Sequence, residues 1–224
     1  LAAHYACRGI KAVPIFWMAT EDHDLAEVDH SHVIDGDSQL QIVRYESGPE
    51  DAAKPVGKVR FSQAIEPCLQ QFLEALPNSE FKVEIAGRLA AAYRPAKTFS
   101  EAFGEVLSFL FSNYGLILVD PQDERLKQMG EPVFEKILLN GSRYQSVIQS
   151  RSDQLVAAGY HAQVTMEEES TGLFFEDEGK RRALIRDDGF IKIKGTAHRL
   201  PVSHFQEALK ESPWKFSPNV LFRP

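Results

Sequence analysis

Two short apolar runs in the chain are each followed directly by acidic residues. In the first run, Val13 to Ala19, six of the seven residues are apolar, and β-branched and aromatic types dominate. The second run, Leu116 to Val119, is entirely aliphatic and ends at Asp120. Continuous runs of this kind are typical of strands buried on both faces of a parallel sheet. A glycine precedes each run (Gly9 and Gly115), and the repeated order predicts a Rossmann-like core.

Apolar residues at helical spacing occupy much of the remaining chain. The segment Thr98-Phe99-Ser100-Glu101 is a helix start signal, with Thr98 or Ser100 as the cap. A long helical region from Gln122 to about Ala158 is expected to break at Gly130-Glu131-Pro132 and around Asn140-Gly141. The other predicted helices cover residues 1–8, 22–28, 62–76, 79–93 and 201–211.

Apolar and polar residues alternate with a period of two from about residue 163. Strands are predicted at residues 164–166, 173–175, 183–185 and 190–193, and they are separated by glycine-containing turns at residues 170–172, 176–179 and 187–189. This order is typical of an antiparallel meander. Two earlier strands are predicted at residues 32–35 and 40–45, joined by the turn Asp35-Gly36-Asp37-Ser38.

The predicted fold is therefore α/β, with a Rossmann-like parallel sheet core and two insertions. Residues 1–35, 98–159 and 213–224 are assigned to the core. Residues 36–97 form a first insertion, mixed and helical, and residues 160–212 form a second insertion, a small antiparallel β-meander with a helix.

The residues after the first apolar run are the main candidates for chemistry. They are Thr20, Glu21, Asp22, His23 and Asp24. Ligands of open α/β sheets collect beyond the carboxyl ends of the strands, where this segment would lie. Neighbouring carboxylates favour the imidazolium form of His23, which could hold an anionic substrate or exchange a proton with an amine. The alternative is a solvated helix start capped by Thr20.

A second group of histidines and carboxylates follows in the chain. Asp29, His30 and His32, together with the residues around His23, could bind a metal, since His30 and His32 would share a face of a strand. No cysteine is near, and the spacing matches no zinc motif, so no metal ligands are assigned. The alternative for His30 and His32 is a surface loop.

Further candidates lie at Asp120 and near the C-terminal end of the sequence. Asp120 ends the second apolar run and could face the same crevice, or it could cap a helix that starts at Pro121. Ser217, Asn219 and Arg223 lie in a loop that runs into a strand. The arginine could bind a carboxylate or phosphate, or the segment could be a tight turn with a solvated arginine.

Composition excludes several classes of partner and compartment. The formal net charge is −7 and no basic run is longer than residues 180–182, so a nucleic-acid partner is not expected. No apolar run reaches the roughly 18 residues of a membrane span. Cys7 and Cys68 are isolated, which indicates a reducing cytoplasm and no disulfide framework. The chain contains neither the dinucleotide-binding motif Gly-x-Gly-x-x-Gly nor the phosphate-binding motif Gly-x-x-x-x-Gly-Lys-Ser/Thr.

Four segments, in the same order along the chain, resemble the bacillithiol biosynthesis cysteine-adding enzymes, a family of cysteine ligases. They are PIFWMATEDHD (14–24) followed by Glu27 to His30, KPVG (54–57), YGLILVDP (114–121) and FSPNVLFRP (216–224). Each segment alone is a weak signal, but together they span nearly the whole chain.

The resemblance implies addition of cysteine to glucosaminyl-malate through a new amide bond. Because amide formation is uphill in water, ATP is the expected activating cosubstrate, and the need for a metal is left open. Asp22, His23 and Asp24 would act in catalysis. Contacts to the substrate or nucleotide would come from the remaining candidates, namely Thr20, Glu21, His30, Asp120, Ser217, Asn219 and Arg223.

The resemblance also implies that residues 1–224 are an internal fragment. In the family, a glycine-rich segment precedes this region, and a coiled coil that could form a homodimer follows it. Two other functions remain open from the residues. One is a nucleotidyl- or acyl-transferring enzyme of the same architecture, and the other is a binding protein without activity.

Overall fold

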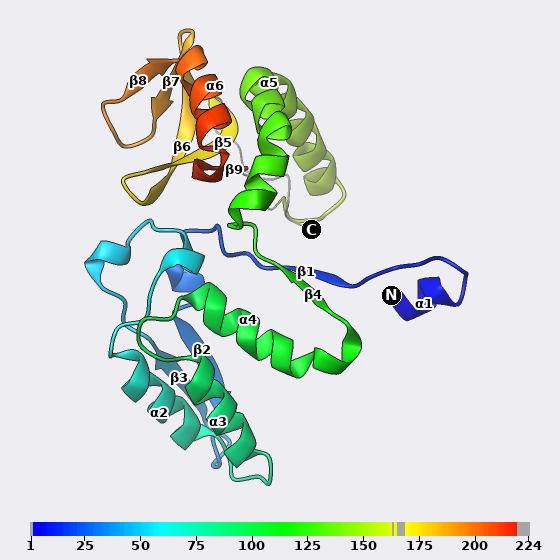
Figure 1. Cartoon of the computed structure of the whole chain (residues 1–224), viewed down its shortest axis with the longest axis vertical. Coiled ribbons are helices and arrows are strands. Elements are labelled where there is room, and N and C mark those ends of the chain that lie inside the picture. Colours follow the sequence, from blue (N-terminus) through cyan, green and yellow to red (C-terminus); the bar gives the residue numbers. More distant parts are fainter. Residues whose placement is uncertain (1, 163, 165–168, 219–224) are drawn as a thin grey trace. The chain divides into compact units, whose positions relative to one another are not determined.

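The computed structural model describes residues 2–162, 164 and 169–218, and the chain divides into two compact units. Unit 1 covers Leu1–Pro121 and unit 2 covers Gln122–Pro224 (Figure 1). No helix among the described residues is both long and apolar enough to cross a lipid bilayer.

The two apolar runs pair in unit 1 as a parallel sheet. Strand β1 (Ile15–Trp17) lies beside β4 (Ile117–Val119), with Ile15 opposite Ile117 (Figure 1). The predicted parallel pairing and mixed α/β class are therefore confirmed. The predicted burial on both faces is wrong for these residues, because Ile15 is 61% exposed and Ile117 49%.

Helix α4 (Phe99–Leu110) packs on one face of this parallel pair. The ring of Phe103 lies 6.0 Å from that of Phe16, and Met18 is buried close to Gly104. The helix begins at a capping box, as the sequence predicts. Thr98 Oγ1 accepts from the backbone N–H of Glu101, and the Glu101 carboxylate accepts from that of Thr98. The latter hydrogen bond lowers the pKa of Glu101.

A hairpin, three helices and several short 3-10 helices form the remainder of the described part of unit 1. Strands β2 (His30–Ile34) and β3 (Leu40–Arg44) are antiparallel, as predicted. Helices α2 (Ile65–Ala75) and α3 (Lys82–Ala92) follow, and α1 covers Ala2–Ala6. Short 3-10 helices cover Leu25–Glu27, Pro49–Asp51, Val56–Lys58 and Ser112–Tyr114. The core of this part contains Tyr45, Phe61, Ile65, Ala92 and Ala102.

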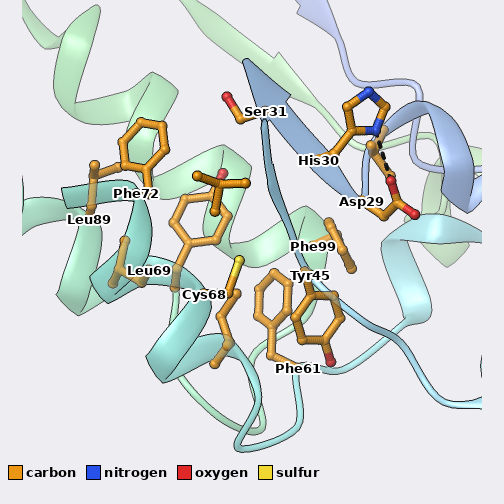
Figure 2. Close-up of a pocket in the computed structure, with 14 residues that line it drawn as sticks. Asp29, His30, Ser31, Tyr45, Phe61, Cys68, Leu69, Phe72, Leu89 and Phe99 are labelled. Atoms are coloured by element: carbon orange, nitrogen blue, oxygen red, sulfur yellow. Dashed lines mark hydrogen bonds and ion pairs between the residues drawn. The ribbon is translucent and has the colours of Figure 1, made fainter. Parts of the chain in front are cut away.

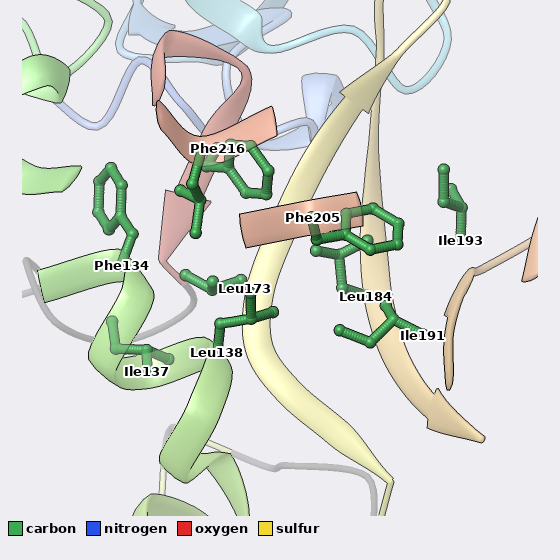
Figure 3. Packing of buried hydrophobic residues seen from close by; sticks show 10 residues of the cluster. Phe134, Ile137, Leu138, Leu173, Leu184, Ile191, Ile193, Phe205 and Phe216 are labelled. Atoms are coloured by element: carbon green, nitrogen blue, oxygen red, sulfur yellow. The ribbon is translucent and has the colours of Figure 1, made fainter. Parts of the chain in front are cut away.

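Unit 2 is a five-stranded antiparallel sheet with helices packed on it, in the strand order β8-β7-β6-β5-β9. Its strands are β5 (Ser170–Asp177), β6 (Lys180–Asp187), β7 (Phe190–Ile193), β8 (Arg199–Pro201) and β9 (Phe216–Pro218). Its helices are α5 (Glu124–Ala157), α6 (Val202–Glu211) and the 3-10 helix Pro213–Lys215. Side chains of α5, α6 and the sheet share one apolar core (Figure 3).

The grouping of β9 and α5 with the antiparallel sheet differs from the core and insertions expected from the sequence. Strand β9 was expected with the Rossmann-like core, but it pairs with β5 of the meander. Helix α5 contributes Phe134, Ile137 and Leu138 to the core that it shares with the same sheet. These contacts join segments distant in sequence, which periodicity along the chain does not report. The strand predicted at residues 164–166 falls largely outside the described residues, and the turn predicted at residues 170–172 is wrong, because these residues belong to β5.

Helix α5 bends at the break predicted around Asn140-Gly141, but the break predicted at Gly130-Glu131-Pro132 is wrong, because the helix continues through Pro132. Asn140 has non-helical angles (φ −115°, ψ 19°), and Arg186 Nη1 donates to Ser142 Oγ at 2.8 Å. A Cβ atom at Gly141 would lie 2.7 Å from the Thr171 carbonyl oxygen and 1.9 Å from Arg186 Nη2. Glycine therefore allows the close approach of α5 to β5.

Gly141→Ala should destabilise unit 2, because the buried backbone at Thr171 must move. We expect a loss of roughly 1–3 kcal/mol, typical of overpacking, measured by urea unfolding with Trp214 fluorescence in a Trp17→Phe background. Gly87→Ala in exposed α3 is the matched control. Nothing lies within 4 Å of its added Cβ, so alanine should stabilise that helix by up to about 1 kcal/mol. Equal effects of the two substitutions would contradict the packing argument.

Candidate functional site

The carboxyl ends of β1 and β4 are tied together by one carboxylate. Thr20 Oγ1 donates to Asp120 Oδ1 at 2.6 Å, and Ser100 Oγ donates to Asp120 Oδ2. Asp120 therefore joins the segments after both strands to the first turn of α4. It does not cap the next helix, because α5 begins at Glu124 and its cap is Asp123. The sequence pattern places Asp120 at this edge but does not identify Ser100 as its partner.

The loop that contains Lys54-Pro55-Val56-Gly57 holds the segment after β1. The N–H of Gly57 donates to the Thr20 carbonyl at 2.9 Å, and that of Val56 donates to the Asp22 carbonyl at 2.6 Å. Pro55, Val56 and Gly57 are buried. Lys54 forms an ion pair with the buried Asp51 at 2.8 Å. Backbone contacts therefore determine where the residues 20–22 lie.

The three predicted catalytic residues have different surroundings. The Asp22 carboxylate accepts from the His23 N–H at 2.8 Å, and its Oδ1 lies 3.5 Å from His23 Nδ1. The His23 side chain is 40% exposed, so it is accessible to a substrate. Asp24 caps the 3-10 helix Leu25–Glu27 by accepting from the Ala26 N–H at 3.2 Å. The alternative of a helix start thus applies to Asp24, and not to the buried Thr20.

His30 lies in an ion-paired group on the hairpin. Its Nδ1 is 2.8 Å from Asp29 Oδ1, and Arg44 Nη1 contacts both oxygens of Asp29 at 2.5 and 2.6 Å. The rings of His30 and His32 are 5.2 Å apart. Among residues 2–162, 164 and 169–218, no group of three or more His, Cys, Asp or Glu side chains could hold a metal ion.

A cavity of about 300 Å³ opens beside the hairpin, between β2, β3 and helices α2 and α3. Figure 2 shows Asp29 and His30 bonded to each other among the lining residues, which otherwise are mostly apolar or aromatic. Cys68 also lines it, and burial raises the pKa of the Cys68 thiol. A raised pKa disfavours the thiolate, so Cys68 is poorly suited to act as a nucleophile.

In unit 2, two cations contact the strand β9. Ser217 is buried, and its hydroxyl oxygen accepts from Arg181 Nε at 3.0 Å. The Arg181 guanidinium also lies over the ring of Phe174, 3.6 Å from its centroid. The ammonium of Lys127, a residue only 6% exposed, donates to the Phe216 carbonyl at 2.6 Å.

Neither Lys127 nor Arg181 is among the residues that the sequence predicts to act near β9. A signal for Lys127 exists in the sequence, because it lies one heptad before Phe134 and two before Gly141, on the buried side of α5. Arg181 lies in β6, and only the pairing of β5 with β9 brings Ser217 close to it. The other two predicted residues of this segment, Asn219 and Arg223, lie outside the described residues.

Comparison with known proteins gives a consistent match over the chain. Residues 3–224 match the family model described as bacillithiol biosynthesis BshC, N-terminal Rossmann-like domain. Relatives named "Putative cysteine ligase BshC" include a protein of Koribacter versatilis (strain Ellin345), 34% identical over 224 residues. Another is from Salinibacter ruber (strain DSM 13855 / M31), 32% identical over 217 residues.

The matched region is only part of each relative. The two alignments cover 100% and 96% of this chain but 41% and 39% of the relatives' own lengths. The chain thus spans about two fifths of the length of these relatives. Because the family model covers nearly every residue, this chain belongs to the bacillithiol biosynthesis BshC family and carries its N-terminal Rossmann-like domain.

Proposed function

We propose that the protein containing residues 1–224 adds cysteine to glucosaminyl-malate by forming an amide bond, a step of bacillithiol biosynthesis. One observation carries the proposal for this chain. Three of the four segments that resemble the family meet in unit 1, through the contacts of Gly57 with Thr20, Val56 with Asp22, and Thr20 with Asp120. His23, whose side chain is 40% exposed, directly follows Asp22 in this group of contacts. Because these segments are distant in sequence but contact one another, the residues that resemble the family belong to one structural feature.

His23 is the residue that we propose for proton transfer. An amine must lose a proton as it attacks an activated carboxyl group, and an accessible imidazole is suited to accept it. Asp22 lies close enough to orient the ring and to stabilise its protonated form. Asp24 would fix the end of the loop by capping the next turn, and Glu21 would lie beside the substrate.

Asp120 is proposed to position the site rather than to bind nucleotide. Its carboxylate accepts a hydrogen bond from Ser100 in the first turn of α4. A helix N-terminus can bind phosphate, but here a carboxylate already lies beside it. We therefore propose that the anionic groups of glucosaminyl-malate or ATP do not bind at this helix terminus, and the assignment of Ser217, Asn219 and Arg223 as ligands stays a prediction from the sequence. Use of ATP rests on the energetics of amide formation.

The compartment proposed for this reaction is the cytoplasm. Both cysteines of the chain are free thiols. Free thiols are typical of a reducing compartment, and a thiol product would also persist there.

An assay of the complete gene product would test the proposed function. The protein is incubated with cysteine, glucosaminyl-malate and ATP, and mass spectrometry follows a product heavier than glucosaminyl-malate by one cysteine residue. We expect that product only when all three compounds are present. Turnover of ATP with cysteine alone would favour a nucleotidyl- or acyl-transferring enzyme with another acceptor. Absence of both turnover and ligand-induced thermal stabilisation would contradict the proposal.

A further inference from the structure

The loop before Val56 contains a strained turn. Residues 51–54 form a β-turn, in which the Lys54 N–H donates to the Asp51 carbonyl at 3.1 Å. Ala52 has φ −57° and ψ 128°, and Ala53 has φ 64°, as in a turn of type II. The third position of such a turn is normally glycine, because a Cβ atom makes the left-handed conformation unfavourable. Ala53 therefore has a backbone conformation that is unfavourable for alanine.

A side-chain ion pair closes the same turn. The Asp51 carboxylate and the Lys54 ammonium, at the first and fourth positions, lie 2.8 Å apart. Asp51 is only 6% exposed, whereas the side chain of Lys54 is 34% exposed. A buried carboxylate requires a charged or hydrogen-bonded partner, so the ion pair opposes any opening of the turn. The charge pairing thus offsets the strain at Ala53.

The turn leads directly into the backbone groups that hold the proposed catalytic segment, residues 20–24. One proline, with its restricted φ, separates the turn from Val56. The Val56 N–H donates to the Asp22 carbonyl at 2.6 Å, and the next N–H, that of Gly57, donates to the Thr20 carbonyl at 2.9 Å. The direction in which the chain leaves the turn therefore decides where these two donors lie.

We propose that Asp51 is a positioning residue for cysteine addition, which acts through the strained turn on the location of His23. The inference rests on the proposed function, in which His23 transfers the proton. A displacement of about 1 Å at a reacting group can lower a rate by about 10²-fold, so a small relaxation of the turn has a large effect. Because Asp51 is buried and contacts no substrate in this role, the effect falls on kcat more than on KM.

Two substitutions in the complete gene product test the proposal. Asp51→Asn removes the charge of the carboxylate, and we expect it to lower kcat for cysteine addition by about 10–100-fold while KM changes little. Adding Ala53→Gly should recover most of the lost kcat, because glycine adopts the left-handed conformation without help from the ion pair. Initial rates at varied cysteine concentration and a thermal melt measure both effects. An unchanged kcat in Asp51→Asn would overturn the proposal.

A second turn provides the matched control for overall stability. Ala96 has φ 69° in a turn where the Lys97 N–H donates to the Arg94 carbonyl at 3.3 Å, and this turn is hydrogen-bonded to Phe61. Ala96→Gly relieves the same kind of strain there, so it should not restore kcat to Asp51→Asn. Equal recovery by the two glycine substitutions would assign Asp51 to overall stability and also overturn the proposal.

A spectroscopic measurement separates this proposal from the proposed reaction. The NMR signal of the His23 imidazole, assigned with His23→Gln, should shift in Asp51→Asn and return when Ala53→Gly is added. This result in a protein that does not add cysteine would reject the proposed function and support the positioning role. An unchanged His23 signal in Asp51→Asn would overturn that role, whatever the activity. Asp51→Glu, which keeps the charge but displaces the carboxylate, replaces Asp51→Asn if that variant does not fold.

Discussion

Replacement of His23 by alanine is expected to lower kcat/KM for cysteine addition by about 10²–10⁴-fold, the usual contribution of a general acid or base. The reason is the position of the imidazole, exposed beside Asp22 in a loop that backbone hydrogen bonds hold in place. Because 40% of the side chain is exposed, its removal should leave the melting temperature nearly unchanged. Initial rates of product formation and a thermal melt of the complete gene product measure both effects.

Two matched variants separate proton transfer from other roles of His23. His198→Ala removes an exposed histidine of unit 2 and should leave the rate unaffected. His23→Gln keeps a side chain that can form hydrogen bonds but cannot transfer a proton, so it should be as slow as His23→Ala. Activity of His23→Ala near that of the unaltered protein would remove His23 from the site. Rescue by glutamine would assign it to binding rather than to proton transfer.

Asp120→Ala is expected to destabilise unit 1 by about 2–4 kcal/mol. Hydrogen bonds to a charged acceptor are worth roughly 1.5–3 kcal/mol each, and this carboxylate accepts from both Thr20 and Ser100. Without it, the segments after β1 and β4 lose their connection to α4. Urea unfolding followed by Trp17 fluorescence, in a Trp214→Phe background, measures the loss.

A double-mutant cycle tests whether the shared carboxylate causes this effect. Thr20→Val and Ser100→Ala each remove one donor, and in the Asp120→Ala background each should cost much less than in the unaltered protein. Unchanged costs in both backgrounds would show that the hydroxyls act independently of Asp120. Asp120→Asn, which keeps one acceptor oxygen, should lie between the unaltered protein and Asp120→Ala.

Features with short-range causes could be predicted from the sequence. The start of α4 depends on Thr98 and Glu101, three residues apart, and the break in α5 depends on Asn140 and Gly141. The hairpin β2–β3 and the meander depend on local turns and a period of two. The order of apolar run and acidic residue was sufficient to predict that β1 and β4 pair in parallel.

The contacts that build the candidate site could not be predicted from local sequence patterns. Asp120 contacts Thr20, which is 100 residues away in the sequence, and Ser100, which is 20 residues away. Because Asp123 is the cap of α5, Asp120 does not cap that helix but connects these segments. Lys127 reaches the Phe216 carbonyl across 89 residues.

The sequence by itself determined the local elements of this protein and which residues follow the two parallel strands. Only the tertiary structure decided which of those residues meet, that β9 belongs with β5, and that Ile15 and Ile117 of the parallel pair are exposed. The physical reason is that capping and turn formation involve residues a few positions apart. Burial and charge pairing instead depend on which distant segments fold against each other.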